Sequence, residues 1–335
     1  MSTNSPIFIV GPPRSGTTLT AKILGRHPNI FIPGETHFFE DIYSRKQELG
    51  NIDSIDTKEK IYTKLSTLYE RYYELHDQHR IDDCFLTVEK EVILNDWDSY
   101  ESILTSFMTC QMIQEGKSRW GNNAPRDIFY VDEILKFYPD AKFIICYRDG
   151  RDFLASYKTR SLVATESHQD RIRRLYHPII TSVLWKSSIK QLLHVSQLIE
   201  EKNYMLMKYE DLVNYPEESA KRMCNAVGEV YFPEMLGIET NNSSALNNDK
   251  GIFTSSIGRW VNELSHTEIF LMECLASKEL ERMGYVKGCY RPNWIEVGML
   301  AFKVPVSLID ALSANRKMIG PILPYLLRRL KAIVT

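Results

Sequence analysis

The segment Gly11-Pro12-Pro13-Arg14-Ser15-Gly16-Thr17-Thr18 combines a glycine-rich turn with one arginine and three hydroxyl side chains. It stands between a short apolar run, Ile7 to Val10, and a segment whose apolar residues recur at helical spacing. A loop between a strand and a helix aims backbone N–H groups at an anion, and the helix N-terminus adds partial positive charge. The segment therefore predicts a binding site for a phosphate-like group.

One residue distinguishes this loop from that of the nucleoside triphosphatases. The spacing matches GxxxxGK[ST], but Thr17 occupies the position of the lysine. In triphosphatases that lysine contacts the β and γ phosphates and the next hydroxyl binds magnesium, whereas here the positive charge, Arg14, lies within the loop. The loop thus favours a less charged group, such as a phosphosulfate, that needs no metal. A turn that merely starts a helix is the alternative, and the PRSGTT composition disfavours it.

A second segment joins an apolar run to a pair of arginines. Lys142 to Tyr147 is the most strand-like stretch of the chain, and it ends on Arg148-Asp149-Gly150-Arg151-Asp152, with Ser156 farther along. A strand that ends in arginine and opens into a helix presents a guanidinium group and a hydroxyl, and both bind phosphate oxygens. This pattern indicates a second anion site. Pairing of Arg148 and Arg151 with Asp149 and Asp152 on a solvated helix start is the alternative.

Strands and helices that alternate along the chain must position these segments. The pattern predicts strands over Ile7 to Val10, Ile30 to Ile32, Lys142 to Tyr147 and Tyr204 to Lys208. It predicts helices over Thr17 to Arg26, Val131 to Phe137, Pro178 to Lys202 and Pro216 to Val227, and one that starts near Asp152. Residues 38–118 show charged, aromatic-rich helical periodicity instead. The prediction is an α/β fold, a P-loop-type parallel sheet flanked by helices with a helical insertion.

The composition of the 335 residues is that of an ordinary folded protein. Hydrophobic residues make up 44% and charged residues 25%, which excludes a wholly disordered or fibrous chain. A net charge of −2 gives no overall reason to expect a nucleic-acid partner. The 6 cysteines lack paired or metal-binding spacing, which indicates a reducing compartment, and the N-terminus carries no signal-like segment. We expect a cytoplasmic protein without a bound metal.

Together, the two anion-binding segments resemble those of the sulfotransferase superfamily, which uses 3′-phosphoadenosine 5′-phosphosulfate (PAPS). PRSGTT at residues 13–18 and RDGR at residues 148–151 are similar to the tyrosylprotein-like and bacterial branch. Supporting stretches are His27-Pro28, Gly34-Glu35-Thr36, Lys208 to Leu212 and Ser256 to Trp260. The resemblance implies an enzyme that transfers a sulfuryl group from PAPS to an acceptor hydroxyl, on a glycan, a lipid or a small-molecule alcohol or phenol.

The resemblance also implies roles for individual residues in binding the donor. The 5′-phosphosulfate would be held by Arg14, Ser15, Gly16, Thr17 and Thr18. Arg148 and Ser156 would hold the 3′-phosphate, and Tyr209 would lie near the adenine. A late loop that closes over the donor would consist of Ser256, Ile257, Gly258, Arg259 and Trp260. The product would be 3′-phosphoadenosine 5′-phosphate (PAP).

Glu35 matches the general base of the tyrosylprotein-like relatives. A carboxylate suits the reaction because an acceptor hydroxyl becomes a useful nucleophile only as its proton leaves. A role in a turn or helix cap is the alternative for a glutamate after Pro-Gly. Asn123 stands where many bacterial relatives carry a lysine, so charge stabilisation must come from Arg14, from His37 or from an unidentified residue. His37 replaces an arginine of the tyrosylprotein enzymes, which argues against an acidic peptide acceptor.

Two other functions fit parts of this pattern. A P-loop phosphotransferase is disfavoured by Thr17 and by the lack of a clear metal-binding aspartate, and Asn123 makes a non-catalytic nucleotide-binding relative conceivable. The predicted boundaries are a sulfotransferase domain over residues 1–290 and a basic amphipathic tail over residues 291–335. Such a tail either contacts an anionic membrane surface or docks its apolar face on the domain, and docking is the commoner outcome.

Overall fold

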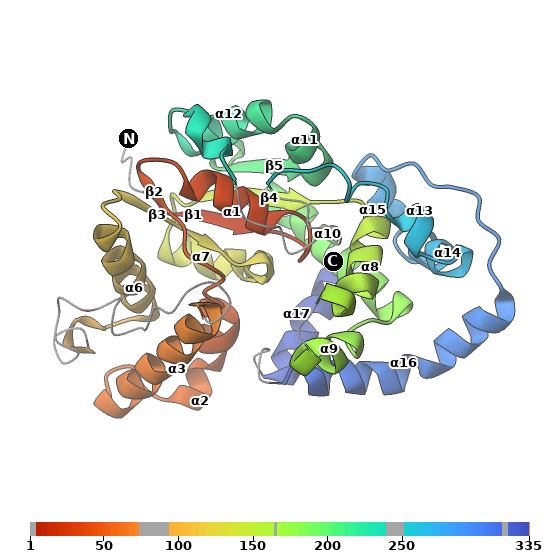
Figure 1. The fold of residues 1–335 in the computed structure, drawn as a ribbon. Coiled ribbons are helices and arrows are strands. Elements are labelled where there is room, and N and C mark those ends of the chain that lie inside the picture. The colour runs from red at the N-terminus through yellow and green to blue at the C-terminus, as the bar shows by residue number, and fades with distance from the viewer. Residues whose placement is uncertain (1–4, 74–93, 164–165, 239–250, 317–320, 335) are drawn as a thin grey trace.

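The computed structural model describes residues 5–73, 94–163, 166–238, 251–316 and 321–334 (Figure 1). Its strands are β1 Ile7–Val10, β2 Ile30–Phe31, β3 Arg119–Asn123, β4 Lys142–Tyr147 and β5 Tyr204–Lys208. The helices up to β5 are α1 Thr17–Gly25, α2 Lys46–Leu49, α3 Ile55–Tyr73, α6 Tyr100–Gln114, α7 Val131–Phe137, α8 Gly150–Thr159, α9 Glu166–Arg173 and α10 Pro178–Leu198. Those after β5 are α11 Tyr209–Asn214, α12 Pro216–Val227, α13 Trp260–Glu263, α14 His266–Leu275, α15 Ser277–Arg282, α16 Trp294–Ala314 and α17 Ile322–Val334.

The described strands form one parallel sheet in the order β2-β3-β1-β4-β5. Ile7 of β1 pairs with Gly121 of β3 on one side and with Lys142 of β4 on the other. Because β1 is central and all strands run in the same direction, the loops that follow them meet at one edge of the sheet. The predicted α/β fold with a parallel sheet is confirmed.

Both faces of the sheet are buried, which explains why its central strands are almost continuously apolar. Successive side chains of β1 alternate between two cores: Ile7 and Ile9 pack with α1 and α12, whereas Phe8 and Val10 pack with the opposite layer. Figure 1 shows α1, α11 and α12 above the sheet, with α7 and α10 below it. The sheet is thus the middle layer of three, and its exposed edge is left for the loops.

The insertion predicted over residues 38–118 is helical where it is described. It contains a π-helical turn over Phe38–Ile42 as well as α2, α3 and α6. The part of the prediction that falls on residues 74–93 lies outside the described residues. β3, at the end of this range, is a strand that the sequence pattern did not predict.

Some predicted boundaries differ from those observed. α8 begins at Gly150, two residues before the predicted start, because the side chain of Asp149 caps the helix by accepting a hydrogen bond from the Arg151 N–H. α10 ends at Leu198 rather than at residue 202, since a 3₁₀ turn over Glu201–Asn203 leads into β5.

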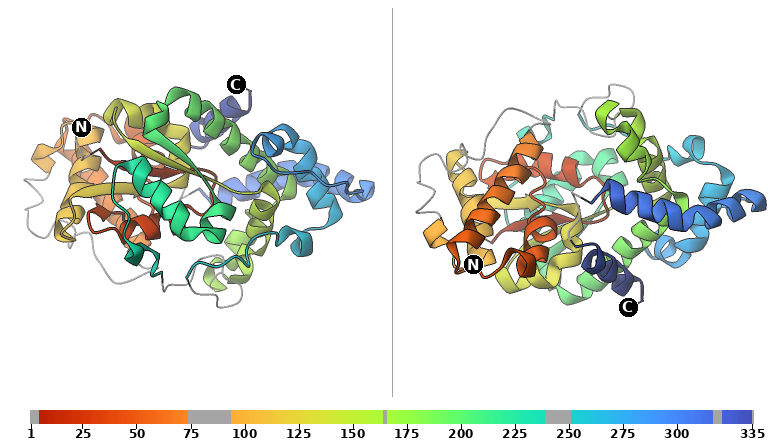
Figure 2. Two further views of the ribbon diagram at one scale, coloured as in Figure 1. Left: turned by 90° about the horizontal axis from the view of Figure 1, so that it is seen from above. Right: turned by 90° about the horizontal axis from the view of Figure 1, so that it is seen from below.

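Two helices, α16 and α17, make up most of the residues predicted as a basic tail. α17 packs against α10, and the Arg328 guanidinium donates to the Phe129 carbonyl and to Glu133, at 2.7 Å from the carboxylate. Seen from below, both helices lie on the underside of the molecule (Figure 2, right). Within the described ranges, no helix is long and apolar enough to cross a membrane.

Candidate functional site

Four of the five described strands each deliver a predicted site residue at the carboxyl end. The anion loop follows β1, Glu35 follows β2, Arg148 follows β4, and Tyr209 follows β5. These residues line one cavity of about 520 Å³. The predicted residues among its lining are Arg14, Gly16, Thr17, Thr18, Glu35, His37, Arg148 and Tyr209. Ser15, Ser156 and Ser256–Trp260 do not line it.

Two glycines determine the shape of the anion loop. Gly11 has a φ of 139°, and a Cβ at this position would stand 2.1 Å from the Cys146 carbonyl oxygen of β4. Gly16, the residue before α1, has a φ of 87° and packs on the Tyr209 ring, which a Cβ would approach to 2.5 Å. The first N–H groups of α1 have no partner within the helix, and the N-cap residue Gly16 has no side chain to accept from them. The loop is therefore shaped by close packing at its two glycines and ends on the N–H groups that open α1.

Arg148 is buried at the other end of the polar region, with 2% of its surface exposed. Its guanidinium lies over the Tyr209 ring at 4.5 Å, 3.7 Å from Asp152, and it donates to the Ser256 carbonyl. Its Nε has no hydrogen-bond partner among the described residues. A buried cationic donor with free hydrogen-bonding capacity is costly unless an anion approaches it, which is the behaviour expected of a binding group.

Arg14 brings the two predicted anion sites together. Its Nε donates to the Ser156 hydroxyl at 3.1 Å, so a residue assigned to the loop contacts one assigned to the second site. Its backbone φ is 66°, an uncommon value for a residue with a side chain. Burial and the neighbouring Arg160 lower the pKa of Arg14 to about 10. Two positive charges in close proximity favour an anion between them.

Glu35 and His37 lie side by side at the cavity wall, with 3.3 Å between His37 Nε2 and the Glu35 carboxylate. The residue between them, Thr36, donates to the Asn122 side chain at 2.8 Å, and Asn122 in turn donates to Asp127 at 2.8 Å. Both contacts are buried, and they join the segment after β2 to β3. The backbone next to Glu35 is thus fixed through Thr36.

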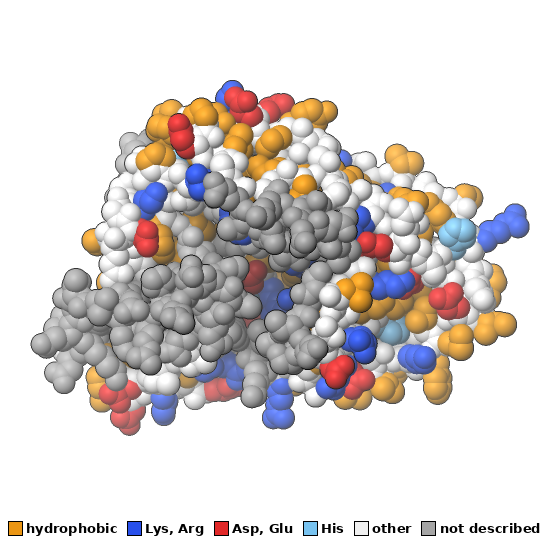
Figure 3. Space-filling model, viewed as in Figure 1, with side chains coloured by type: hydrophobic (Ala, Val, Ile, Leu, Met, Phe, Trp, Pro, Cys, Tyr) orange, Lys and Arg blue, Asp and Glu red, His pale blue; other side chains and the backbone are white. Residues whose placement is uncertain are grey.

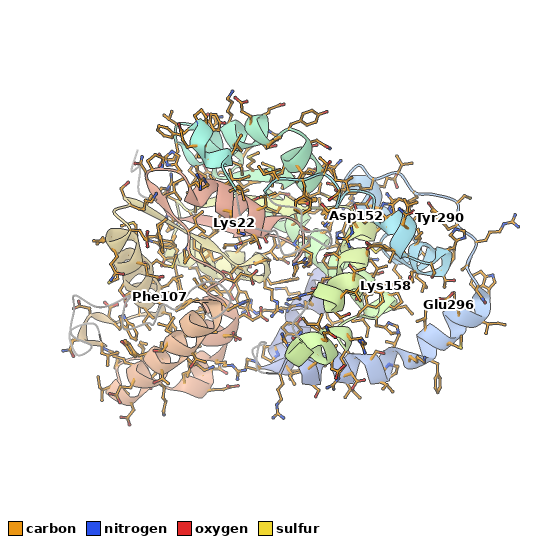
Figure 4. All side chains as sticks on the ribbon, in the orientation of Figure 1. Lys22, Phe107, Asp152, Lys158, Tyr290 and Glu296 are labelled. Atoms are coloured by element: carbon orange, nitrogen blue, oxygen red, sulfur yellow. The ribbon has the colours of Figure 1, made fainter. Side chains whose placement is uncertain are left out.

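The late loop is fastened to α8. Asp152, labelled on α8 in Figure 4, accepts from the backbone N–H groups of Gly258 and Trp260 at 2.8 and 3.2 Å. The Ser256 hydroxyl lies 2.5 Å from that of Tyr209. Arg259, a predicted donor-binding residue, contacts Glu263 at 2.7 Å. The loop therefore meets the site through Ser256, while Arg259 faces a carboxylate of the protein itself.

The two arginines of the RDGR motif differ in their surroundings. Arg151 pairs with Asp149 at 2.7 Å and with Glu273 at 2.9 Å, and its guanidinium lies over the Trp260 ring at 4.2 Å. The alternative prediction, pairing with acidic neighbours, therefore describes Arg151 and also Arg148, which lies 3.7 Å from Asp152, although both pairs are buried rather than solvated. Only Arg148 of this motif lines the cavity.

Arg126 lines the cavity and was missed by the sequence analysis. It follows β3, whose end lies beside the anion loop, and the Gly11 N–H donates to the Pro125 carbonyl at 3.1 Å. Burial lowers the pKa of Arg126, but nearby groups raise it further, so that its net pKa lies above the usual arginine value. These groups are Tyr325, Glu40, Tyr157 and Glu35. Arg126 is thus a charged group close to Glu35, three residues after the asparagine that replaces the expected lysine.

Comparisons with known proteins agree with this arrangement. Protein-tyrosine sulfotransferase A of Caenorhabditis elegans is 23% identical over 300 residues, which cover 86% of this chain and 69% of that protein. Protein-tyrosine sulfotransferase 1 of Danio rerio is 22% identical over 310 residues, covering 86% and 74%. Both matches extend over most of this chain rather than over one motif.

Solved structures show the same fold. The sulfotransferase domain from the curacin biosynthetic pathway matches with a TM-score of 0.54 and 16% identity, over 85% of this chain and 99% of that chain. The sulfotransferase domain of the Synechococcus PCC 7002 olefin synthase matches with a TM-score of 0.50 and 19% identity, over 82% and 97%. A model of the sulfotransferase family matches residues 6–233, from the strand before the anion loop to the residues after α12. The chain therefore belongs to the sulfotransferase family and is a sulfuryl-transferring enzyme.

Proposed function

We propose that the chain binds PAPS at the carboxyl edge of the sheet and transfers its sulfuryl group to an acceptor hydroxyl beside Glu35. The anion loop, from Arg14 to Thr18, would hold the 5′-phosphosulfate. Arg148 and Ser156 would hold the 3′-phosphate, with Tyr209 and the late loop around the nucleoside. The observation that carries the proposal is the single cavity shared by Arg14, Glu35 and Arg148.

The residues present fit such a donor. Ser15 Oγ and Arg148 Nε are buried and have no hydrogen-bond partner among the described residues, and both belong to predicted anion sites. A Cβ at Gly16 would clash with the Tyr209 ring, so glycine lets the loop pack on the residue proposed to lie near the adenine. Arg14 contacts Ser156, so the groups proposed for the two phosphates are within reach of one ligand. A nucleotide with phosphates at both its 3′ and 5′ positions matches this distribution of donors.

The donor supplies a sulfuryl group attached to a phosphate leaving group. Glu35 would take the proton of the acceptor hydroxyl. The hydroxyl oxygen would bond to sulfur while the bond between sulfur and the phosphate oxygen breaks. Arg14 and the N–H groups at the start of α1 stabilise the negative charge that develops on the departing phosphate. The Thr36–Asn122–Asp127 hydrogen bonds hold the backbone next to Glu35, and burial raises the pKa of Asp127 well above its usual range.

The role of Arg148 is tested by the affinity for PAP. Charge-assisted hydrogen bonds contribute about 1.5 to 3 kcal/mol each, so Arg148→Ala should weaken PAP binding by at least about tenfold. Titration calorimetry with PAP and with adenosine 5′-phosphate provides the comparison. The variant should bind adenosine 5′-phosphate as the unmodified protein does, which also serves as the control for folding. Equal affinity of the unmodified protein for the two nucleotides would remove the 3′-phosphate assignment.

We further propose a cytoplasmic enzyme that contacts an anionic membrane surface through α16. One face of this helix exposes large apolar side chains to solvent: Ile295, Met299, Phe302, Val306 and Ile309. Orange side chains gather over α16 along the lower right edge of Figure 3. Exposed cations, Lys303 and Arg316, accompany this apolar face, a combination that suits anionic lipids. The described cysteines are free, in keeping with a reducing compartment.

Sedimentation with vesicles tests the membrane contact. The chain should sediment with phosphatidylglycerol vesicles at low salt and less at high salt, because salt screens surface charges. Replacing Met299, Phe302 and Val306 by serine should weaken binding by at least about tenfold, since each removes apolar area. Ile113→Ser, at an exposed position of α6, is the matched control. Failure of the unmodified chain to sediment, or a dimer that the triple variant dissociates, would contradict the proposal.

A further inference from the structure

The cavity that contains the predicted donor site extends into an apolar chamber between α10, α16 and α17. Each helix contributes two of the following side chains to the lining: Ile180, Leu184, Leu308, Leu312, Leu326 and Ile333. The same cavity is lined by Arg14, Glu35 and His37, which follow β1 and β2. One continuous space of about 520 Å³ therefore adjoins both charged groups at the sheet and apolar side chains of these helices.

The wall made by α16 follows helical spacing. Val304, Leu308, Ala311 and Asn315 lie three to four positions apart and face the cavity. The side chains of Ile295, Met299, Phe302, Val306 and Ile309 are exposed on another face of the helix. The residues of α16 that line the cavity therefore lie on a different face from those that are exposed to solvent.

α17 is held in place by several polar contacts. Arg328 pairs with Glu133, the Lys190 ammonium donates to the Ile333 carbonyl, and Arg329 lies 3.8 Å from Glu40. These contacts reach α7, α10 and the segment after β2. Because α17 contacts three separate parts of the domain, its position is fixed and it forms a defined wall of the chamber. Both α16 and α17 lie beyond residues 6–233, the part matched by the family.

The chemistry of the lining restricts what the chamber can bind. Most side chains that α10, α16 and α17 contribute to the lining are apolar, although Thr181, Ser187, Ser188, Asn315 and Arg329 also line it. Against the apolar majority, many hydroxyl, amide or carboxylate groups of a sugar or an acidic peptide would lack partners, which is costly. An aliphatic chain or fused hydrocarbon rings would instead gain from the removal of apolar surface from water. A volume of about 520 Å³ lies within the usual range of small-molecule sites.

We infer that the acceptor is an alcohol with a long or polycyclic hydrocarbon body. Its hydroxyl would lie beside Glu35, and its body would lie between α10, α16 and α17. This inference rests on the proposed function, because it places the acceptor in the same cavity as the donor. It also gives a role to the apolar side chains that these helices contribute to a cavity shared with Arg14 and Arg148.

The dependence of turnover on chain length tests the inference. Butanol, hexanol, octanol and decanol are offered with labelled PAPS. Each buried methylene should raise kcat/KM by up to about fourfold, so decanol should exceed butanol by on the order of a hundredfold or more. Cholesterol and a tyrosine peptide with acidic neighbours are included as further acceptors. Equal turnover of the four alcohols, or faster turnover of the peptide than of decanol, would overturn the inference.

Two variants locate the effect in the chamber. Ala311→Trp should fill the space and abolish the advantage of decanol over butanol, and Leu308→Asn should reduce that advantage by making the wall polar. Ala301→Trp is the matched control, because Ala301 is exposed on the same helix and does not line the cavity. If the chamber variants keep the chain-length dependence of the unmodified protein, the acceptor binds elsewhere.

Binding of PAP separates this inference from the proposed function. Titration calorimetry of decanol into the PAP complex should show a negative heat-capacity change in the unmodified chain and none in Ala311→Trp. PAP affinity should be the same in both. Failure of the unmodified protein to bind PAP contradicts the proposed function, whereas normal PAP binding without any decanol signal contradicts only the inference about the acceptor.

Discussion

Glu35→Gln should lower turnover by about 10² to 10⁴-fold, the usual contribution of a general base. The amide keeps the shape of the side chain but cannot take the proton of the acceptor hydroxyl. Because Glu35 contacts His37 and the backbone beside it is held through Thr36 and Asn122, the change should leave the wall of the cavity in place. The measurement is sulfuryl transfer from labelled PAPS to decanol or to another acceptor found in the alcohol series.

PAP affinity, measured beside turnover, identifies the reason for any loss. PAP affinity should be nearly unchanged in Glu35→Gln, and His37→Gln should lose less turnover than Glu35→Gln. Near-normal turnover of Glu35→Gln would remove Glu35 from the role of base and leave His37, 3.3 Å away, as the next candidate. Loss of PAP binding would show instead that Glu35 supports the anion loop.

Four of the five described strands, and the loop between β1 and α1, could be predicted from sequence because their signals are local. Lys142–Tyr147 is an apolar run buried on both faces, and the observed bounds of β4 are those predicted. The bounds of α12 were predicted correctly for a similar reason: Pro216 occupies its first position, and Gly228 follows its end with a φ of 79°. In a parallel sheet the residues that follow the strands lie at the same edge, so predicting the strands was enough to predict that these residues lie near one another.

β3 could not be predicted because its own residues do not favour a strand. Its sequence, Arg-Trp-Gly-Asn-Asn, contains residue types that are depleted in strands. It is stabilised by distant partners: Arg119 donates to the carbonyls of Ser5 and Val227, and Asn122 bonds to Thr36. Contacts between residues so far apart in sequence carry no local signal, and with β3 the position of Arg126 was missed as well.

The surroundings of the basic residues near the C-terminus were equally invisible in the sequence. Arg328 and Arg329 look like the cations of a membrane-binding tail, but they contact Glu133 and Glu40 in the domain. Charge pattern alone does not reveal whether a cation faces solvent or a distant carboxylate. The chamber proposed for the acceptor could not be predicted for the same reason, since it is formed where α16 and α17 meet the distant helix α10.

Arg126 resolves the difficulty raised by Asn123. The resemblance implies a lysine near the transferred group at this position, whereas this chain has an asparagine whose side-chain oxygen is buried without a hydrogen-bond partner among the described residues. Arg126 lines the cavity and is positively charged, because its pKa lies above the usual arginine value. We expect Arg126, three residues after Asn123, to supply the positive charge near the transferred group.

Arg126→Ala should therefore lower turnover by about 10² to 10³-fold, the loss typical of removing one group that stabilises developing charge. Arg126→Lys should recover part of the activity, because it keeps the charge but not the planar guanidinium. PAP affinity should change much less than turnover, since Arg148 and the loop provide most of the proposed donor contacts. Arg173→Ala, at an exposed arginine of α9, is the matched control. Near-normal turnover of Arg126→Ala would assign the stabilising charge to Arg14, whereas equal losses in the alanine and lysine variants would indicate that Arg126 acts by packing rather than by charge.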